Sequence, residues 1–112
     1  MKAGSLYHLF AFDARDAVSD GAGNTQGAFV EQFQCNAGRL VLRGGETVMA
    51  ARLEGRQPVI LSVRAETRTN RITSDWRARD VRTGEVFNIR SIQPSEKRDA
   101  IELLCEAGVA DG

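Results

Sequence analysis

The sequence predicts a mainly β fold: a small antiparallel barrel or sandwich of six or seven strands with one short helix. Two observations predict it. Short apolar segments recur along the whole chain of 112 residues, separated by turns rich in glycine, aspartate or proline. Only one segment, by contrast, has the apolar spacing and the end residues of a helix. The chain length fits a single domain, which we place at residues 1–112.

The first half of the chain contains three predicted strands, at residues 6–12, 28–36 and 39–43, because these segments are rich in apolar residues. Residues 13–27 carry several glycines and aspartates, which favour turns, and long loops in compact domains tend to be functional or mobile. A mobile loop is therefore predicted there, although the spacing of its acids does not match a calcium-binding EF-hand. Its polar turn-forming residues are Asp13, Asp16, Asp20 and Asn24.

A short helix is predicted at residues 46–54. Glu46 stands in the first turn, where the helix dipole favours an acid, and Arg52 stands in the last turn. Gly44 and Gly45 interrupt the chain before the helix, and another glycine follows it as a stop. A helix of this length is not stable alone, so we expect it to pack on the sheet.

The second half of the chain contains four predicted strands, at residues 58–64, 75–82, 85–92 and 100–105. The middle two form a hairpin around Thr83 and Gly84. The polar segment 68–72 is predicted to be a turn-containing link. Residues 107–112 are predicted to form a flexible tail.

Charge is balanced overall but unevenly distributed. Fifteen basic residues offset 15 acidic ones, which argues against a dedicated nucleic-acid binder. Residues 56–98 carry ten bases and five acids, a net of +5, whereas residues 99–112 carry four acids and no base, a net of −4. Such polarity would help copies of the chain to dock head to tail, or it would reflect two solvated faces. The sequence leaves both interpretations open.

The residues that usually carry enzyme or metal chemistry are sparse. Cys35 and Cys105 lie far apart in apolar segments, so both are predicted to be buried, reduced thiols. His8, the only histidine, lies in a predicted strand, and no Cys/His cluster suggests zinc. We therefore predict no catalytic residue, no metal and no cofactor. No apolar run approaches the ~20 residues of a membrane span, so we expect a soluble protein without a membrane partner.

Two groups of residues are candidates for binding. Arginines in the link and the hairpin could contact the phosphates of DNA without reading its sequence, or could be solvated charges that prevent sheet aggregation. These are Arg68, Arg71, Arg77 and Arg79. The corner that contains the predicted helix is a candidate interface with an adaptor or with another subunit. Its residues are Arg43, Gly44, Gly45, Glu46, Arg52 and Arg56.

Several segments resemble phage head–tail joining proteins, also described as head-closure (stopper) or head–tail adaptor proteins, a family that includes neck proteins of gene transfer agents. The resemblance spans most of the chain and is carried by its patterning. The segments are residues 1–6, 44–52, 69–73, 84–92 and 100–106. The chain departs from the family pattern around residues 29–42, where Phe29 and Phe33 stand in place of an expected Trp-containing strand, which leaves the local register open.

The resemblance implies a structural protein without enzymatic activity at the neck of a virion or phage-like particle, assembled in the bacterial cytoplasm. Such proteins form a ring, expected to hold six or twelve copies, that closes the DNA channel after packaging and provides the platform for the tail. The implied partners are other copies of the chain, a portal or adaptor protein above, a tail-terminator or tail-tube protein below, and passing double-stranded DNA.

Three other functions are alternatives to this one. A tail-terminator or other tail ring protein is also structural, but the matches at the two ends of the chain favour joining. A nucleic-acid-binding β-barrel would bind free DNA in a salt-dependent manner, and the zero net charge argues against it. A small enzyme would need a cluster of titratable residues, which the sequence does not contain.

Overall fold

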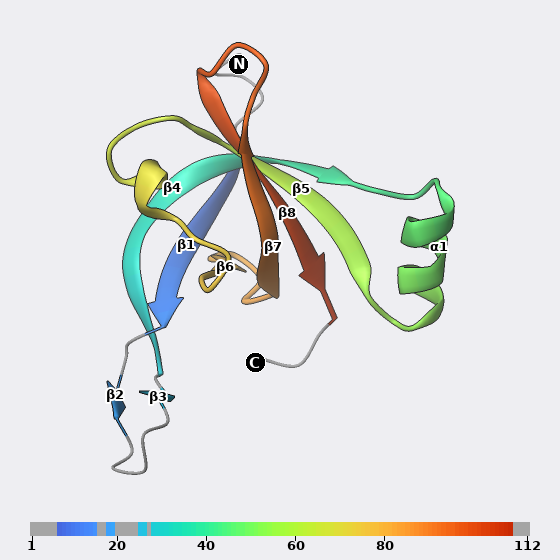
Figure 1. The fold of residues 1–112 in the computed structure, drawn as a ribbon, viewed down its shortest axis with the longest axis horizontal. Coiled ribbons are helices and arrows are strands. Elements are labelled where there is room, and N and C mark those ends of the chain that lie inside the picture. Colours follow the sequence, from blue (N-terminus) through green and yellow to red (C-terminus); the bar gives the residue numbers. More distant parts are fainter. Residues whose placement is uncertain (1–6, 16–17, 20–24, 27, 109–112) are drawn as a thin grey trace.

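The computed structural model describes residues 7–15, 18–19, 25–26 and 28–108, which form a closed antiparallel barrel in the strand order β1-β4-β5-β8-β7-β6 (Figure 1). This confirms the predicted fold class. The barrel strands are β1 (His8–Arg15), β4 (Phe29–Val41), β5 (Gln57–Arg64), β6 (Arg77–Asp80), β7 (Val86–Pro94) and β8 (Ala100–Ala107). The short strands β2 (Val18–Ser19) and β3 (Thr25–Gln26) pair only with each other.

Alternation of apolar residues along the strands fills the barrel interior. Phe12 stacks on Phe33 with their ring centroids 5.3 Å apart, and Phe10 meets Phe87 edge-on at 5.6 Å. Aliphatic side chains of β5 and β8 complete this core. They are Val59, Leu61, Val63, Ile101 and Leu103. A closed barrel has no free sheet edge, so each of these strands is paired on both sides.

The first half of the barrel differs from the sequence prediction in one respect. Segments 28–36 and 39–43, predicted as two strands, form the single bent strand β4, which curves around one side of the barrel (Figure 1). Its first part, up to Ala37, pairs with β1, and its last part, from Gly38, pairs with β5. A continuous strand is favoured because it satisfies the backbone groups of two different neighbours in succession.

Strand β1 is longer than predicted and extends through Asp13 to Arg15, so Asp13 belongs to the barrel wall and not to a loop. Residues 13–15 remain in the strand because they pair with β4, and Asp13 also pairs with Arg77 of β6. The other predicted loop residues, Asp16, Asp20 and Asn24, lie outside the described residues. At the other end of the chain β8 continues to Ala107, the first residue of the predicted tail, and residues 109–112 are likewise not described.

Two β-bulges alter which side chains face the core. Gln32 is the extra residue between β1 and β4, and Arg90 is the extra residue between β7 and β8. A bulge shifts the alternation by one residue. Beyond Arg90, Ile92 therefore packs against the core, whereas Ser91, which simple alternation placed beside Phe87 and Ile89, is exposed.

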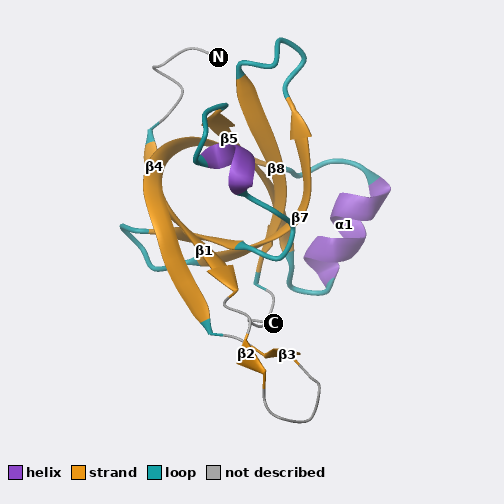
Figure 2. Cartoon of the chain, turned by 60° about the vertical axis from the view of Figure 1, so that its left-hand side comes forward, coloured by secondary structure: helices purple, strands orange, loops and turns teal. Residues whose placement is uncertain are grey.

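The predicted polar link contains a short 3-10 helix, η2 (Thr69–Arg71), which lies within the ring of strands in the view of Figure 2. Thr69 is only 2% exposed, and its hydroxyl donates to the carbonyl oxygen of Arg64 at 2.6 Å. Ile72 and Trp76, which follow η2, belong to the core cluster. The link therefore closes one end of the barrel.

The predicted helix is present as α1 (Glu46–Leu53), which lies outside the barrel beside β5 (Figures 1 and 2). It follows Gly45, whose φ of 92° is accessible mainly to glycine. Ala51 is its one buried residue, whereas Met49 and Leu53 are exposed. Among the described residues no helix is long and apolar enough to cross a membrane.

Candidate interaction surfaces

A buried acid on β1 is the shared hydrogen-bond partner of two arginines on the neighbouring strand β6. Asp13 is 2% exposed, and Arg77 donates from Nε to its Oδ2 at 2.9 Å. Arg79 donates to both oxygens of Asp13, at 3.2 and 3.3 Å, and to Glu31 Oε1 at 2.9 Å. The hydrogen bonds to Asp13, and then those to Glu31, raise the pKa of Arg79. We call these four residues the Asp13 cluster.

The Asp13 cluster bears on the predicted DNA contacts. Arg77 also lies over the ring of Phe29, with its guanidinium carbon 4.3 Å from the ring centroid, and Arg15 lies over the same ring at 4.4 Å. The sequence suggested that Arg77 and Arg79 face DNA. Their acidic partners neutralise much of that charge, so these two arginines are weaker candidates for phosphate contacts than arginines without such partners.

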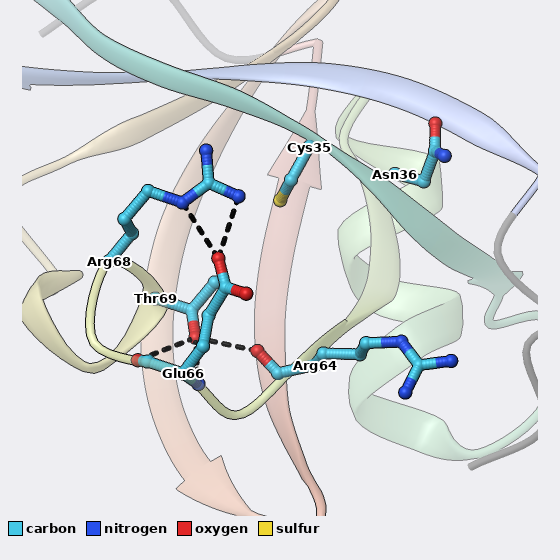
Figure 3. Close-up of a pocket in the computed structure, with 6 residues that line it drawn as sticks. All are labelled: Cys35, Asn36, Arg64, Glu66, Arg68 and Thr69. Carbon is cyan, nitrogen blue, oxygen red and sulfur yellow. Dashed lines mark hydrogen bonds and ion pairs between the residues drawn. The ribbon is translucent and has the colours of Figure 1, made fainter.

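A shallow pocket of about 170 Å³ lies near η2 (Figure 3). Arg68 forms an ion pair with Glu66 at 2.7 Å, and its guanidinium carbon lies 5.1 Å from the ring centroid of Phe33. The guanidinium of Arg64 points away from this pair in Figure 3. The exposed Arg71 ends η2. We refer to Arg64, Arg68 and Arg71 as the basic edge.

Neither cysteine is poised for nucleophilic chemistry. Cys35 lines the pocket, and burial raises the pKa of its thiol to about 11. Cys105 is fully buried, and burial raises the pKa of its thiol to about 12. A thiol is a weak nucleophile while it remains protonated. Across the described ranges, no group of three histidine, cysteine or acidic residues could hold a metal ion.

The residues of the predicted interface corner fall into two groups in the structure. Arg43 and Arg52 are exposed, and Nη1 of Arg52 donates to the carbonyl oxygen of Arg43 at 3.4 Å, which ties α1 to the chain that leads into it. Gly44, Gly45 and Glu46 are exposed beside them. These residues form one continuous accessible surface.

Arg56, by contrast, lies in an ionic chain. It pairs with Glu54 at 2.7 Å and with Glu106 at 3.3 Å, and Glu106 in turn accepts from Nε of Arg90 at 2.8 Å. These ion pairs link the segment between α1 and β5 to β7 and β8. Arg56 therefore has a structural role in addition to any contact with a partner.

Comparison with known proteins decides the family. The family model described as phage head completion protein matches residues 1–108. The chain belongs to the phage head completion protein family. This confirms the resemblance seen in the sequence and, with it, a structural role in a phage-type particle.

Solved structures share this fold at low sequence identity. The solution structure of a Shigella flexneri 2a protein matches with a TM-score of 0.71 and 19% identity, covering 99% of this chain and 100% of that one. A chain from the virion of a native gene transfer agent particle matches with a TM-score of 0.69 and 19% identity, covering 95% and 97%. At this identity the two likenesses concern the fold. A search of the curated proteins found no match.

Sequence reasoning missed an apolar row on the outside of this head completion family member, in which the half-buried Ile60 lies between the exposed Leu40 and Leu104. Leu40, Ile60 and Leu104 are register partners on β4, β5 and β8, and they face outward. The sequence contained a sign of this row, because each of its residues is an apolar residue at a strand position where the alternation of apolar and polar residues would place a polar one. It could be interpreted only once the register between the strands was known.

Proposed function

We propose that this protein forms a ring at the neck of a tailed phage or gene transfer agent particle, between a portal or adaptor protein and the tail. The ring closes the DNA channel after packaging and provides the surface on which the tail docks. The match to the head completion family over residues 1–108 is the observation that carries this proposal. Assembly in the bacterial cytoplasm, from six or twelve copies, belongs to the same proposal.

Helix α1 is the proposed docking arm for the neighbouring neck protein. It stands beside the barrel, and its last residue, Leu53, is 86% exposed. Met49 lies one helical turn before Leu53, so the two side chains share one face of the helix. An apolar side chain ringed by polar groups is a typical anchor for a partner protein, and Arg43 and Arg52 supply the polar surroundings.

The basic edge is the proposed contact with DNA in the channel. Arg64 and Arg71 are exposed, and among the described residues neither forms an ion pair. Arg68 is also exposed but pairs with Glu66. Arginines contact phosphates without reading the base sequence, which suits a protein that must accept any packaged DNA.

The experiment that tests this function is electron microscopy of particles from cells that lack the gene. We expect empty or leaking heads beside finished, unattached tails, because the seal and the joining surface are both absent. Tailed particles of normal appearance would contradict the proposal. Heads that retain their DNA, together with tails of abnormal length, would instead identify the protein as a tail terminator.

A further inference from the structure

One outer face of the barrel has a small hollow bordered by apolar side chains. Leu40, Ile60 and Leu104 stand opposite one another on three neighbouring strands, so they form a row about 10 Å long. Leu40 is 59% exposed and Leu104 is 37% exposed. A hollow of about 150 Å³ adjoins the row, lined by Ile60, Ser91, Gln93, Glu102 and Leu104. We call this surface the hollow face.

A second apolar group protrudes from the wall formed by β1 and β6. Tyr7 is 79% exposed, and Leu9 and Val81 are 42% and 38% exposed. Leu9 and Val81 are held together, because the backbone N–H of Val81 donates to the carbonyl oxygen of Leu9 at 3.1 Å. Arg82, which is exposed, follows directly. We call this surface the knob face.

The two faces lie on opposite sides of the barrel. In the closed strand order, β1 and β6 are neighbours, and each is two or three strands away from β5 and β8, which form the centre of the hollow face. Leu40 on β4 and Ser91 and Gln93 on β7 lie at the margins of that face. When the hollow face of one copy contacts the knob face of the next, the first copy therefore still has a free knob face and the second copy a free hollow face. Contacts of this head-to-tail type continue around a ring when the rotation between copies closes.

Charge favours contact between unlike faces. Glu102 borders the hollow, and the part of the chain that the structure describes contains no ion pair to it. The knob face carries Arg82, whose side chain is likewise without an acidic partner among the described residues. Two hollow faces would bring acids together and two knob faces would bring bases together, whereas a hollow face against a knob face pairs opposite charges.

We infer that the knob face of one copy packs into the hollow face of the next copy, with Tyr7 and Leu9 against the row of Ile60 and Leu104. This inference rests on the proposed function, because it assigns the contact that builds the neck ring. The occupant of the hollow face is thus a second copy of this chain. Helix α1 remains available for a different protein.

Cross-linking within purified particles tests the inference. A chain with both Leu9→Cys and Ser91→Cys, treated with a short flexible bismaleimide, should give a ladder of covalent multimers. Either substitution alone should give no ladder and no dimer, because a head-to-tail contact does not bring identical positions together. The unmodified chain, which retains Cys35 and Cys105, is the control for reaction at native thiols.

The outcomes separate this inference from the proposed function. Particles that contain the protein but give no ladder with the double variant would contradict the inference alone. Dimers from Ser91→Cys alone would also overturn it, because the hollow face would then meet itself. Complete tailed particles without the protein would contradict the proposed function and the inference with it.

A charge exchange gives a second, independent readout. Arg82→Glu or Glu102→Arg alone should lower the yield of complete particles about tenfold or more, because each places like charges at the contact. The chain that carries both substitutions should recover most of the yield, since the opposite charges meet again in exchanged positions. A double variant that is as poor as the worse single variant would overturn the inference.

Discussion

The guanidinium of Arg79 holds the carboxylate of Asp13 through two hydrogen bonds, from Nε to Oδ2 at 3.3 Å and from Nη2 to Oδ1 at 3.2 Å. Arg77 adds a third, from its Nε to Oδ2 at 2.9 Å. Bidentate pairs between arginine and carboxylate combine charge attraction with fixed geometry. Because Asp13 and its two partners lie in β1 and β6, the cluster fastens the strand pair that joins the first barrel strand to β6 and closes the barrel.

Loss of the Asp13 carboxylate should weaken the fold. We predict that Asp13→Asn lowers the free energy of unfolding by about 2 kcal/mol, because a buried charged partner of two arginines is removed, while the partial exposure of those arginines limits the cost. Urea unfolding measures the change. The matched control is Glu31→Gln, which removes the exposed partner of Arg79 and should cost less than about 0.5 kcal/mol. Equal effects of the two substitutions would contradict this account.

Two glycines with similar backbone conformations should respond differently to alanine. Gly108 has a φ of 84°, and a Cβ there would overlap the carbonyl oxygen of Gly55. Gly84 has a φ of 79°, but its surroundings are open. We predict that Gly84→Ala costs about 1 kcal/mol from backbone strain alone. Gly108→Ala should cost clearly more, and thermal unfolding of both variants provides the comparison.

Stability should fall at alkaline pH because of Cys105. Burial raises the pKa of this thiol from 9.0 to about 12, so above pH 9 the unfolded chain releases the proton while the folded chain retains it. Folding stability from this group is therefore complete below pH 9 and is lost as the pH rises toward 12, by about 1.4 kcal/mol per pH unit. Urea unfolding at pH 8 and pH 10 should show a larger decline for the natural chain than for Cys105→Ala. Parallel declines would refute the assignment.

The exposed apolar face of α1 should matter for assembly and not for folding. Leu53→Asp should leave the free energy of unfolding within about 0.5 kcal/mol, because the side chain is almost fully exposed. In particles, the same change should block docking of the neighbouring neck protein and leave heads without tails. Thr47→Asp is the control, because Thr47 is exposed and lies on another side of the same helix from Met49 and Leu53, and the change should be tolerated. Normal tail attachment with Leu53→Asp would remove α1 from the proposed docking surface.

The basic edge should affect DNA retention through its charge. We predict that Arg71→Glu reduces the fraction of heads that keep their DNA, because an acid replaces a cation that faces phosphates. Arg71→Lys preserves the charge and should behave like the natural chain. Nuclease protection of packaged DNA measures retention, and unchanged protection with Arg71→Glu would exclude this contact.

Local patterns predicted the strands and the helix well where a residue's neighbours in sequence determine its structure. The helix at 46–54 is found at Glu46–Leu53, because glycines before and after it and charges at its ends are local signals. Predictions failed where a distant partner decides the outcome. Asp13 was assigned to a loop because aspartate favours turns, but Arg77 and Arg79, more than 60 residues later, hold it in the wall.

The candidate surfaces were predictable to a smaller extent. The sequence identified the exposed corner around α1, since that corner follows from the local break at Gly44 and Gly45. It could not show that Arg79 is paired, or that Leu40 and Leu104 share one face, because both facts depend on strand register. Two bulges, at Gln32 and Arg90, also shift the alternation of the strands that contain them. A bulge results from the fit between two strands and leaves little trace in either strand alone.

Cryo-electron microscopy of complete particles tests the central claim most directly. The account predicts a closed ring of six-stranded barrels between the head and the tail, with α1 of each copy against a neighbouring neck protein. A neck that is fully occupied by other proteins, while this chain is absent from the particle or lies elsewhere in it, would contradict the account.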